Sequence, residues 1–388
     1  MPDSTHTPPD PAAARGALTY SRAGVDVAHT DAIKSGIAGF VDSPNPRVLN
    51  GLGPFASLYD IRFDSIKDPV LVLKAEEPGS KQKLAIQYGY AESVCHDLVN
   101  HLVNDIAVMG ARPLAVLDTI VCGDADRATI TALVKGLSEA CRENECDLVG
   151  GETSIQPGVL DSGIYILSAS IAGIVDRGNI IDGSKTQPGD KILALASNGL
   201  HTNGYTLVRL LMEEQPQILQ EKPGGETFPE AIMKPHTPYY RAIKDLYADP
   251  SLHGMAHITG GGMEGNIPRV LPVSLSARID LGKIRIPPVF QLIRQYGNIN
   301  DEEMLKTFNC GVGLVLIAAP GAAAAMIEAV SAHCPCYEIG EVVRAAAPDM
   351  STSGAAAPDA GKTGTAAPDL SKSAAPIELT GHLRWDAS

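Results

Sequence analysis

The sequence lacks several features that would place the chain in a specialised class of protein. Its 388 residues contain no apolar run of the roughly 18 residues that a membrane helix needs. The seven cysteines are odd in number and form no Cys-x-x-Cys pair, so neither a disulfide framework nor a zinc ribbon is indicated. We therefore expect a cytoplasmic protein, kept in a reducing environment, that has no membrane partner.

Excess positive charge is also missing, and we expect no signal peptide. The formal net charge is -14 and the pI is near 5.1, which argues against a nucleic-acid partner because phosphates would need a basic patch against the overall field. Residues 1–15 have no apolar core of a signal peptide, and we expect residues 1–17 to form a disordered extension. The negative net charge is still compatible with a small anionic substrate if glycine loops and Mg²⁺ neutralise the charge of that substrate.

The composition is otherwise that of a globular enzyme with two domains. Hydrophobic residues make up 44% of the chain and charged residues 20%. A polar Gly/Pro stretch predicts a boundary between an N-terminal domain at 18–182 and a C-terminal domain at 183–344. A repeated Ala-Ala-Pro-Asp pattern predicts a flexible low-complexity insert at 345–376, followed by a last strand and tail at 377–388.

One turn, Ser197 to Tyr205, organises the second half. It follows the apolar run 191–196 and precedes apolar residues at helical spacing, so it joins a strand to a helix. His201, Thr202 and Asn203 stand at the helix start, where they would suit an anionic group. The alternative is that Asn and Gly merely form the turn and that His201 lies on the surface.

The first half offers candidate metal ligands in two segments, a helix and a glycine turn. In a helix expected from Ser93 onward, Asp97, His101 and Asp105 follow at four-residue intervals and form one stripe, which could bind a hard cation or be a solvated polar face. Glu152 follows Gly150 and Gly151 at an expected chain reversal. There it would bind Mg²⁺ or act in catalysis, or be only a turn residue.

The remaining segments give further strands, helices and glycine loops. Strands are predicted at 69–73, 84–88, 114–121 and 164–175, and a glycine turn with a buried strand at 308–317. The helix from Ser93 has an apolar face of Val94, Leu98, Leu102 and Ile106, and another helix has an inner face from Ile130 to Cys141. The loop 50–57 is either a backbone cradle for a ligand or a tight connection. Three consecutive glycines after His257 are hard to explain by packing, so they predict a phosphate or substrate loop.

Several motifs together resemble the phosphoribosylformylglycinamidine cyclo-ligase family of the aminoimidazole ribonucleotide (AIR) synthase superfamily. The resemblance runs from about residue 20 to 343. It rests on Tyr-Ser-Arg-Ala-Gly-Val-Asp26, Asn-Gly-Leu-Gly-Pro-Phe55, Val-Asn-Asp105, Leu-Val-Gly-Gly-Glu-Thr153, Ile-Ile-Asp-Gly-Ser-Lys185, His-Thr-Asn-Gly-Tyr205, His-Ile-Thr-Gly-Gly-Gly262 with Asn-Ile-Pro-Arg-Val-Leu-Pro272, and Phe-Asn-Cys-Gly-Val-Gly313.

The resemblance implies an α/β (α+β) fold of two domains and a homodimer. The N-terminal sheets of two subunits would join into a barrel at the dimer interface, beside a C-terminal α/β domain. The implied reaction is ATP-dependent closure of formylglycinamidine ribonucleotide to 5-aminoimidazole ribonucleotide, with release of ADP and phosphate, in purine biosynthesis. ATP would be the co-substrate and Mg²⁺ the cofactor.

The resemblance also implies roles for particular residues. His201, His257 and Lys81 would be catalytic, with Lys81 facing the phosphates and either histidine able to move a proton. Glu76, Asp105 and Glu152 would hold Mg²⁺. The residues that would bind ATP or substrate are Gly51, Gly53, Gly79, Ser80, Gly150, Gly151, Thr202, Asn203, Gly260, Gly261 and Gly262.

One loop departs from the family pattern. The family reads Asp-Gly-Val-Gly-Thr-Lys where this chain has Glu76-Glu77-Pro78-Gly79-Ser80-Lys81. Glu77 adds negative charge near a triphosphate, and Pro78 removes one backbone N–H. Two rival hypotheses follow: a small-molecule kinase that uses the same cleft, and a non-catalytic scaffold that binds a nucleotide or a partner protein.

Overall fold

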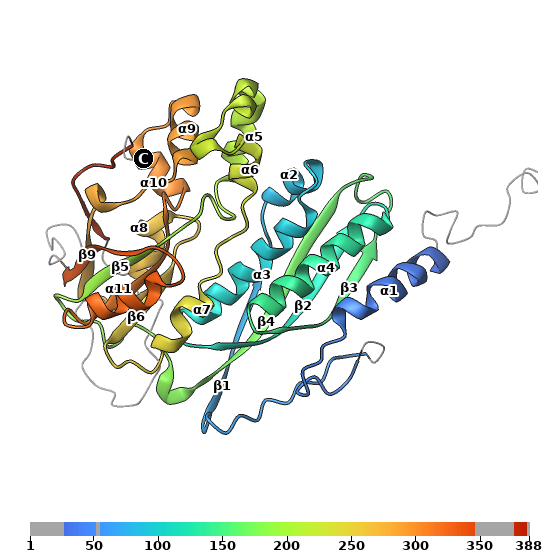
Figure 1. The fold of residues 1–388 in the computed structure, drawn as a ribbon, viewed down its shortest axis with the longest axis horizontal. Coiled ribbons are helices and arrows are strands. Elements are labelled where there is room, and N and C mark those ends of the chain that lie inside the picture. The colour runs from blue at the N-terminus through green and yellow to red at the C-terminus, as the bar shows by residue number, and fades with distance from the viewer. Residues whose placement is uncertain (1–26, 52–54, 346–375, 386–388) are drawn as a thin grey trace, which may run out of the picture.

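The chain forms two sheets, each with helices packed against it (Figure 1). The computed structural model describes residues 27–51, 55–345 and 376–385. The predicted extension at 1–17, residues 346–375 of the predicted insert, the tail from 386 onward and Gly53 lie outside these residues. Within the described part, no helix is both long and apolar enough to cross a bilayer.

The first half forms a four-stranded sheet in the order β1-β4-β2-β3. Strands β2 and β3 run parallel, and β4 is antiparallel to both β1 and β2. The elements are α1 (Val27–Val41), β1 (Pro69–Glu76), α2 (Lys81–Gln87), α3 (Ala91–Ala107), β2 (Arg112–Cys122), α4 (Arg127–Glu143), β3 (Asp147–Ile155) and β4 (Tyr165–Asp176).

Helices α3 and α4 cover one face of this sheet, and none of the described helices covers the other, which we call the open face (Figure 1). The predicted apolar stripes explain the covered face, since Leu98, Leu102, Ile130 and Leu133 are fully buried. On the open face, large apolar side chains are exposed: Leu71, Leu73, Leu117 and Ile166.

The second half forms a six-stranded sheet in the order β10-β7-β9-β5-β8-β6. Its inner strand β8 is buried at every residue, as expected of a continuous apolar run. Its elements are β5 (Lys191–Ala196), α5 (Tyr205–Glu214), α6 (Phe228–Met233), α7 (Tyr240–Ile243), β6 (Leu252–His257), α8 (Gly262–Asn266), β7 (Leu275–Asp280), α9 (Pro288–Gly297), α10 (Asp301–Thr307), β8 (Val312–Ala318), α11 (Ala323–Ser331), β9 (Cys336–Arg344) and β10 (Glu378–Thr380).

Two local predictions are wrong. Residues 84–88 were expected as a strand, but residues 84–87 belong to α2, because Lys81, Leu84 and Ala85 are buried together at helical spacing. Interpreting Lys81 as a loop residue concealed that pattern. Glu152 does not lie at a chain reversal, since β3 continues past the two glycines to Ile155.

Candidate active site

Helix α3 carries a polar stripe that joins the two halves of the chain. Its Asn100 Nδ2 donates to the carbonyl of His236 at 2.6 Å, and Asn104 Nδ2 donates to that of Thr237 at 2.9 Å. The Asn104 Oδ1 in turn accepts from the Tyr239 N–H at 2.9 Å. Since these groups are buried and hydrogen-bonded, the segment 234–239 is held firmly against α3.

Further along the same stripe, Asp105 lies at the centre of a cluster of charged and imidazole groups. Its Oδ1 is 2.7 Å from His257 Nδ1, and its Oδ2 is 2.9 Å from Lys74 Nζ. The Lys74 ammonium also lies 3.1 Å from Glu76 Oε2, and His101 Nε2 lies 3.7 Å from both carboxylates. The structure therefore brings together two predicted metal ligands, Glu76 and Asp105, with a cation already between them.

Four histidines surround this point and form what we call the histidine cluster: His101, His201, His236 and His257. The His201 and His236 rings stack with centroids 3.9 Å apart, and His236 Nε2 lies 2.8 Å from His257 Nε2. His101 and His257 meet edge to face at 5.2 Å. The cluster thus joins α3, the organising turn, the segment before α7 and the end of β6.

Burial sets the protonation of these groups. It lowers the pKa of His101 to about 4, with the neighbouring His257 contributing, and it places the pKa of His201 and His236 well below the usual range. Burial alone would raise the pKa of Asp105, but the His257 hydrogen bond and the nearby positive charges outweigh it and hold that pKa well below its usual range. At neutral pH the site therefore combines ionised Asp105 with neutral imidazoles at His101, His201 and His236.

The organising turn meets this cluster from the second half. Thr202 Oγ1 is 3.2 Å from His101 Nδ1, and His201 has a positive φ of 60°, a conformation that non-glycine residues rarely adopt. Asn203 Nδ2 is buried with no partner among the described residues. Ser80 Oγ lies 3.4 Å from Thr206 Oγ1, so the Gly79–Ser80 loop also reaches this turn.

Gly204 fixes the turn, and we predict that Gly204→Ala destabilises the protein. Its φ is 80°, and an added Cβ would lie 2.1 Å from the Phe308 ring. Overpacking and left-handed strain together should cost at least about 2 kcal/mol, measured by urea unfolding. The control is Gly39→Ala in α1, where nothing lies within 4 Å of an added Cβ. Equal free energies of unfolding for Gly204→Ala and Gly39→Ala would contradict the claim that Gly204 fixes the turn.

The three glycines after His257 have a packing explanation that the sequence did not reveal. Gly261 and Gly262 have positive φ values of 88° and 59°, and a Cβ on Gly262 would lie 1.9 Å from the Leu305 carbonyl oxygen. The expectation that packing does not explain these glycines is therefore wrong for Gly262, whereas Gly261 is explained by its left-handed backbone conformation. Gly260 is less constrained and borders Asn203 Oδ1, at 3.4 Å from an added Cβ.

Lys81 lies in a different environment from the predicted one. Its side chain is fully buried rather than facing a phosphate, and its Nζ donates to Asp97 Oδ1 at 2.8 Å and to the carbonyls of His201 at 3.1 Å and Lys234 at 2.7 Å. Burial lowers the pKa of Lys81 and raises that of Asp97 to about 6. The pair holds α2, α3 and the second half together.

Glu152 does not join Glu76 and Asp105 within one chain. Glu76 pairs with Ala169, Ala169 with Asp118, and Asp118 with Gly151, so Glu76 and Gly151 lie three strand spacings apart, about 14 Å. The residue after Gly151 points to the opposite face of the sheet. The metal role of Glu152 stays a prediction.

Glu152 instead lines a pocket of about 640 Å³ on the open face of the first sheet. Gly51, Gly150 and Gly151 line it too, together with Leu73, Leu117 and Asp118. Burial raises the pKa of Asp118 to about 7, and the charge of Glu152 adds to that rise. The predicted ligand-binding glycines thus separate into two groups, one at this pocket and one at the histidine cluster.

Sequence reasoning missed three residues of the site: Lys74, Asp97 as the partner of Lys81, and His236. Lys74 could have been found by extending the predicted strand 69–73 to Glu76, as the structure has it, because Lys74 and Glu76 then share one face. His236 lies in an irregular segment and gives no periodic signal. Glu77, whose charge was expected to repel a triphosphate, is exposed.

Comparison with known proteins defines the class to which this fold and site belong. Residues 66–175 match the family described as "AIR synthase related protein, N-terminal domain", and residues 187–350 match its "C-terminal domain". The fold is also that of thiamine-monophosphate kinase from Stenotrophomonas maltophilia, with a TM-score of 0.59 and 18% identity over 93% of this chain and 98% of that one. A hydrogenase maturation protein HypE solved with ATP gives a TM-score of 0.58 at 16% identity, over 83% of this chain and 88% of that one.

Curated relatives narrow the class to one family. The phosphoribosylformylglycinamidine cyclo-ligase of Methylobacillus flagellatus is 40% identical over 340 residues, which cover 87% of this chain and 98% of the relative. That of Geobacillus kaustophilus is 38% identical over 343 residues, covering 87% and 99%. The chain belongs to the phosphoribosylformylglycinamidine cyclo-ligase family.

Proposed function

We propose that this protein closes formylglycinamidine ribonucleotide to 5-aminoimidazole ribonucleotide with ATP as co-substrate, in purine biosynthesis. The observation that carries the proposal is the meeting of Glu76 and Asp105 from one half with His201, Thr202 and His257 from the other. These are the residues that the family resemblance assigns to the site. We keep the domain division at 182/183 as part of the same proposal.

The chemistry needs an activated oxygen and a positioned nitrogen. The formyl oxygen attacks the γ-phosphorus of ATP and ADP leaves, and the ribose-bearing nitrogen then attacks the former formyl carbon and expels phosphate. Phosphoryl transfer depends mainly on positioning and charge neutralisation, so buried, preorganised groups are what the site must supply.

The carboxylates of Glu76 and Asp105 fit a divalent cation. Their oxygens already share one positive charge, the Lys74 ammonium, at 3.1 and 2.9 Å. Oxygen donors of this kind suit Mg²⁺, which when bound would neutralise phosphate charge. Glu76 and Asp105 would hold it, and Lys74 would then be free to face a phosphate.

Proton movement falls to the histidine cluster. Because ionised Asp105 only accepts hydrogen bonds, His257 donates its Nδ1–H to Asp105, which fixes the ring orientation. The unprotonated His257 Nε2 then accepts the Nε2–H of His236, 2.8 Å away. Once substrate displaces that contact, His257 Nε2 is the base that takes the proton from the attacking nitrogen. The His201 ring stacks on the His236 ring.

The test is incubation of the purified protein with ATP, Mg²⁺ and formylglycinamidine ribonucleotide, with ADP and the aminoimidazole product both quantified. We expect equal amounts of the two. ADP formed without the imidazole would instead favour the small-molecule kinase, and neither product would favour the scaffold.

We further propose a homodimer in which two open sheet faces join into a barrel. The support is the exposed apolar row of that face, where Leu73 is 71% exposed and Leu71 54%. Leu73→Glu is expected to yield a monomer by light scattering, since it places charge in the interface. The control is Leu210→Glu, an exposed leucine on α5, which should stay dimeric. If wild type is monomeric or Leu73→Glu stays dimeric, this interface is wrong.

A further inference from the structure

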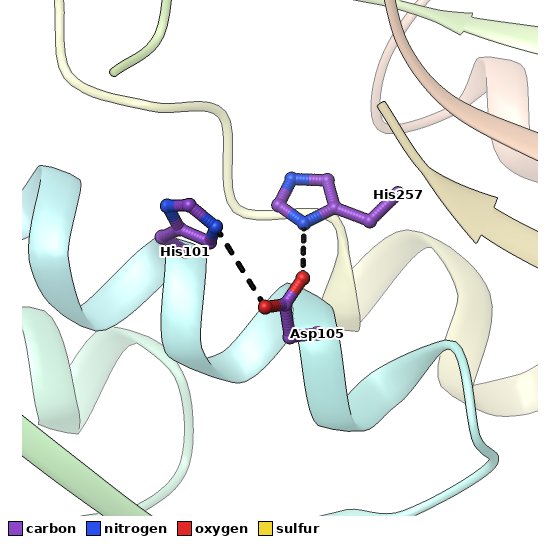
Figure 2. Close-up of side chains that lie close together, drawn as sticks. All are labelled: His101, Asp105 and His257. Carbon is purple, nitrogen blue, oxygen red and sulfur yellow. Dashed lines mark hydrogen bonds and ion pairs between the residues drawn. The ribbon is translucent and has the colours of Figure 1, made fainter. Parts of the chain in front are cut away.

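Three side chains from α3 and β6 direct donor atoms at one point: His101, Asp105 and His257 (Figure 2). One donor atom of each lies within 4.8 Å of the other two. We propose that these residues form a binding site for a divalent cation of the Zn²⁺ class. The site rests on the geometry of the chain and needs neither nucleotide nor the proposed activity.

The donor set selects the kind of metal. Two imidazole nitrogens and one carboxylate oxygen suit Zn²⁺, whereas Mg²⁺ prefers oxygen ligands alone. Tetrahedral ligands about 2.1 Å from zinc lie roughly 3.4 Å from one another. His101 Nε2 and Asp105 Oδ2 are already 3.7 Å apart, and the three donor atoms all lie within 4.8 Å of one another. The 2.7 Å contact of His257 with Asp105 has to widen.

The outer ring nitrogens have the partners that metal-binding histidines require. His101 presents Nε2 to the site while its Nδ1 lies 3.2 Å from Thr202 Oγ1. His257 presents Nδ1 to the site, and metal binding moves its proton from Nδ1, where it is donated to Asp105 without metal, to Nε2, which lies 2.8 Å from His236 Nε2. Such outer contacts hold the ring orientation and tautomer of zinc ligands. Both imidazoles are also buried, at 7% and 5% exposure, so a metal would not have to order them.

A fourth ligand and a competitor are both present. Glu76 Oε2 lies 3.7 Å from His101 Nε2 and can complete the coordination. The Lys74 ammonium contacts the same two carboxylates, so it must leave when the metal enters. Once it has left, two carboxylates balance the two charges of Zn²⁺. If the proposed function holds, bound Zn²⁺ also excludes Mg²⁺ from Glu76 and Asp105.

The experiment is calorimetric titration of the chelator-stripped, full-length protein with zinc chloride, and separately with magnesium chloride, without nucleotide. We expect one Zn²⁺ per chain, bound at least about 100-fold more tightly than Mg²⁺. His101→Ala should weaken Zn²⁺ binding by about 100-fold or more, since even outer-shell losses cost 10- to 100-fold. Lys74→Met should strengthen it, because the competing cation is gone. His96→Ala is the matched control on α3, where His96 pairs only with Glu143.

The outcomes separate clearly. A wild type that binds no Zn²⁺, or binds it no better than Mg²⁺, overturns the site, as does a His101→Ala variant that binds Zn²⁺ normally. The gain expected for Lys74→Met cannot come from misfolding. Since the measurement reads metal binding alone, its failure leaves the cyclo-ligase proposal standing, and an inactive enzyme leaves the zinc site standing.

Discussion

Replacing Lys81 by Met is expected to lower the free energy of unfolding by about 3–5 kcal/mol. Lys81 and Asp97 are both fully buried, and the Lys81 ammonium donates to Asp97 and to two backbone carbonyls of the second half. Without the ammonium, a buried carboxylate is left without its counter-charge, and burial already raises the pKa of Asp97 to about 6. The measurement is urea unfolding at pH 7.

A second variant tests the cause of that loss. Adding Asp97→Asn to Lys81→Met removes the unpaired charge and keeps an oxygen for the His236 N–H, which now donates to Asp97 Oδ1 at 2.8 Å. Much of the stability should return. Lys135→Met, which removes surface ion pairs with Glu92 and Glu139, should change little. A Lys81→Met protein as stable as the Lys135→Met protein would refute the structural role of the pair.

Replacing Asp105 by Asn is expected to lower kcat by at least about 100-fold while leaving the fold intact. Asn keeps the size of the side chain but removes the charge that Lys74 and His257 contact at 2.9 and 2.7 Å. It therefore weakens both the proposed cation site and the orientation of His257. The measurement is steady-state formation of ADP and of the imidazole product, with circular dichroism to confirm folding.

The matched control is Asp68→Asn. Asp68 forms an exposed ion pair with Arg177 just before β1, at the opposite end of that strand from Glu76, and its loss should leave kcat unchanged. A near-normal kcat for a folded Asp105→Asn protein would show that Asp105 neither holds the cation nor orients His257 during catalysis, and would contradict the roles proposed for it.

Much of the fold followed from periodicity. The four-residue repeats of α3 and α4 and the apolar run of β8 are strong local signals, and the structure has these elements where they were predicted. The fold class was correct because the motif order matched a two-domain family. The short segment 84–88 was assigned wrongly because its helical pattern includes Lys81, a charged residue that only tertiary contacts keep buried.

The site was less accessible to sequence reasoning, because it is assembled from separate elements. The stripe of Asp97, His101 and Asp105 was visible as a spacing, but its partners Lys81, Lys74 and His257 come from α2, β1 and β6. No local pattern indicates that His236 stacks on His201. Likewise, only the strand order places Glu152 on the far side of the sheet from Glu76.

The most direct test of the central claim follows an oxygen atom. Formylglycinamidine ribonucleotide labelled with ¹⁸O in its formyl group is incubated with the protein, ATP and Mg²⁺, and the released phosphate is analysed by mass spectrometry. If ATP activates that oxygen, each imidazole formed is accompanied by one phosphate carrying the label. Imidazole formed with unlabelled phosphate, or ATP consumed without any imidazole, would contradict the account.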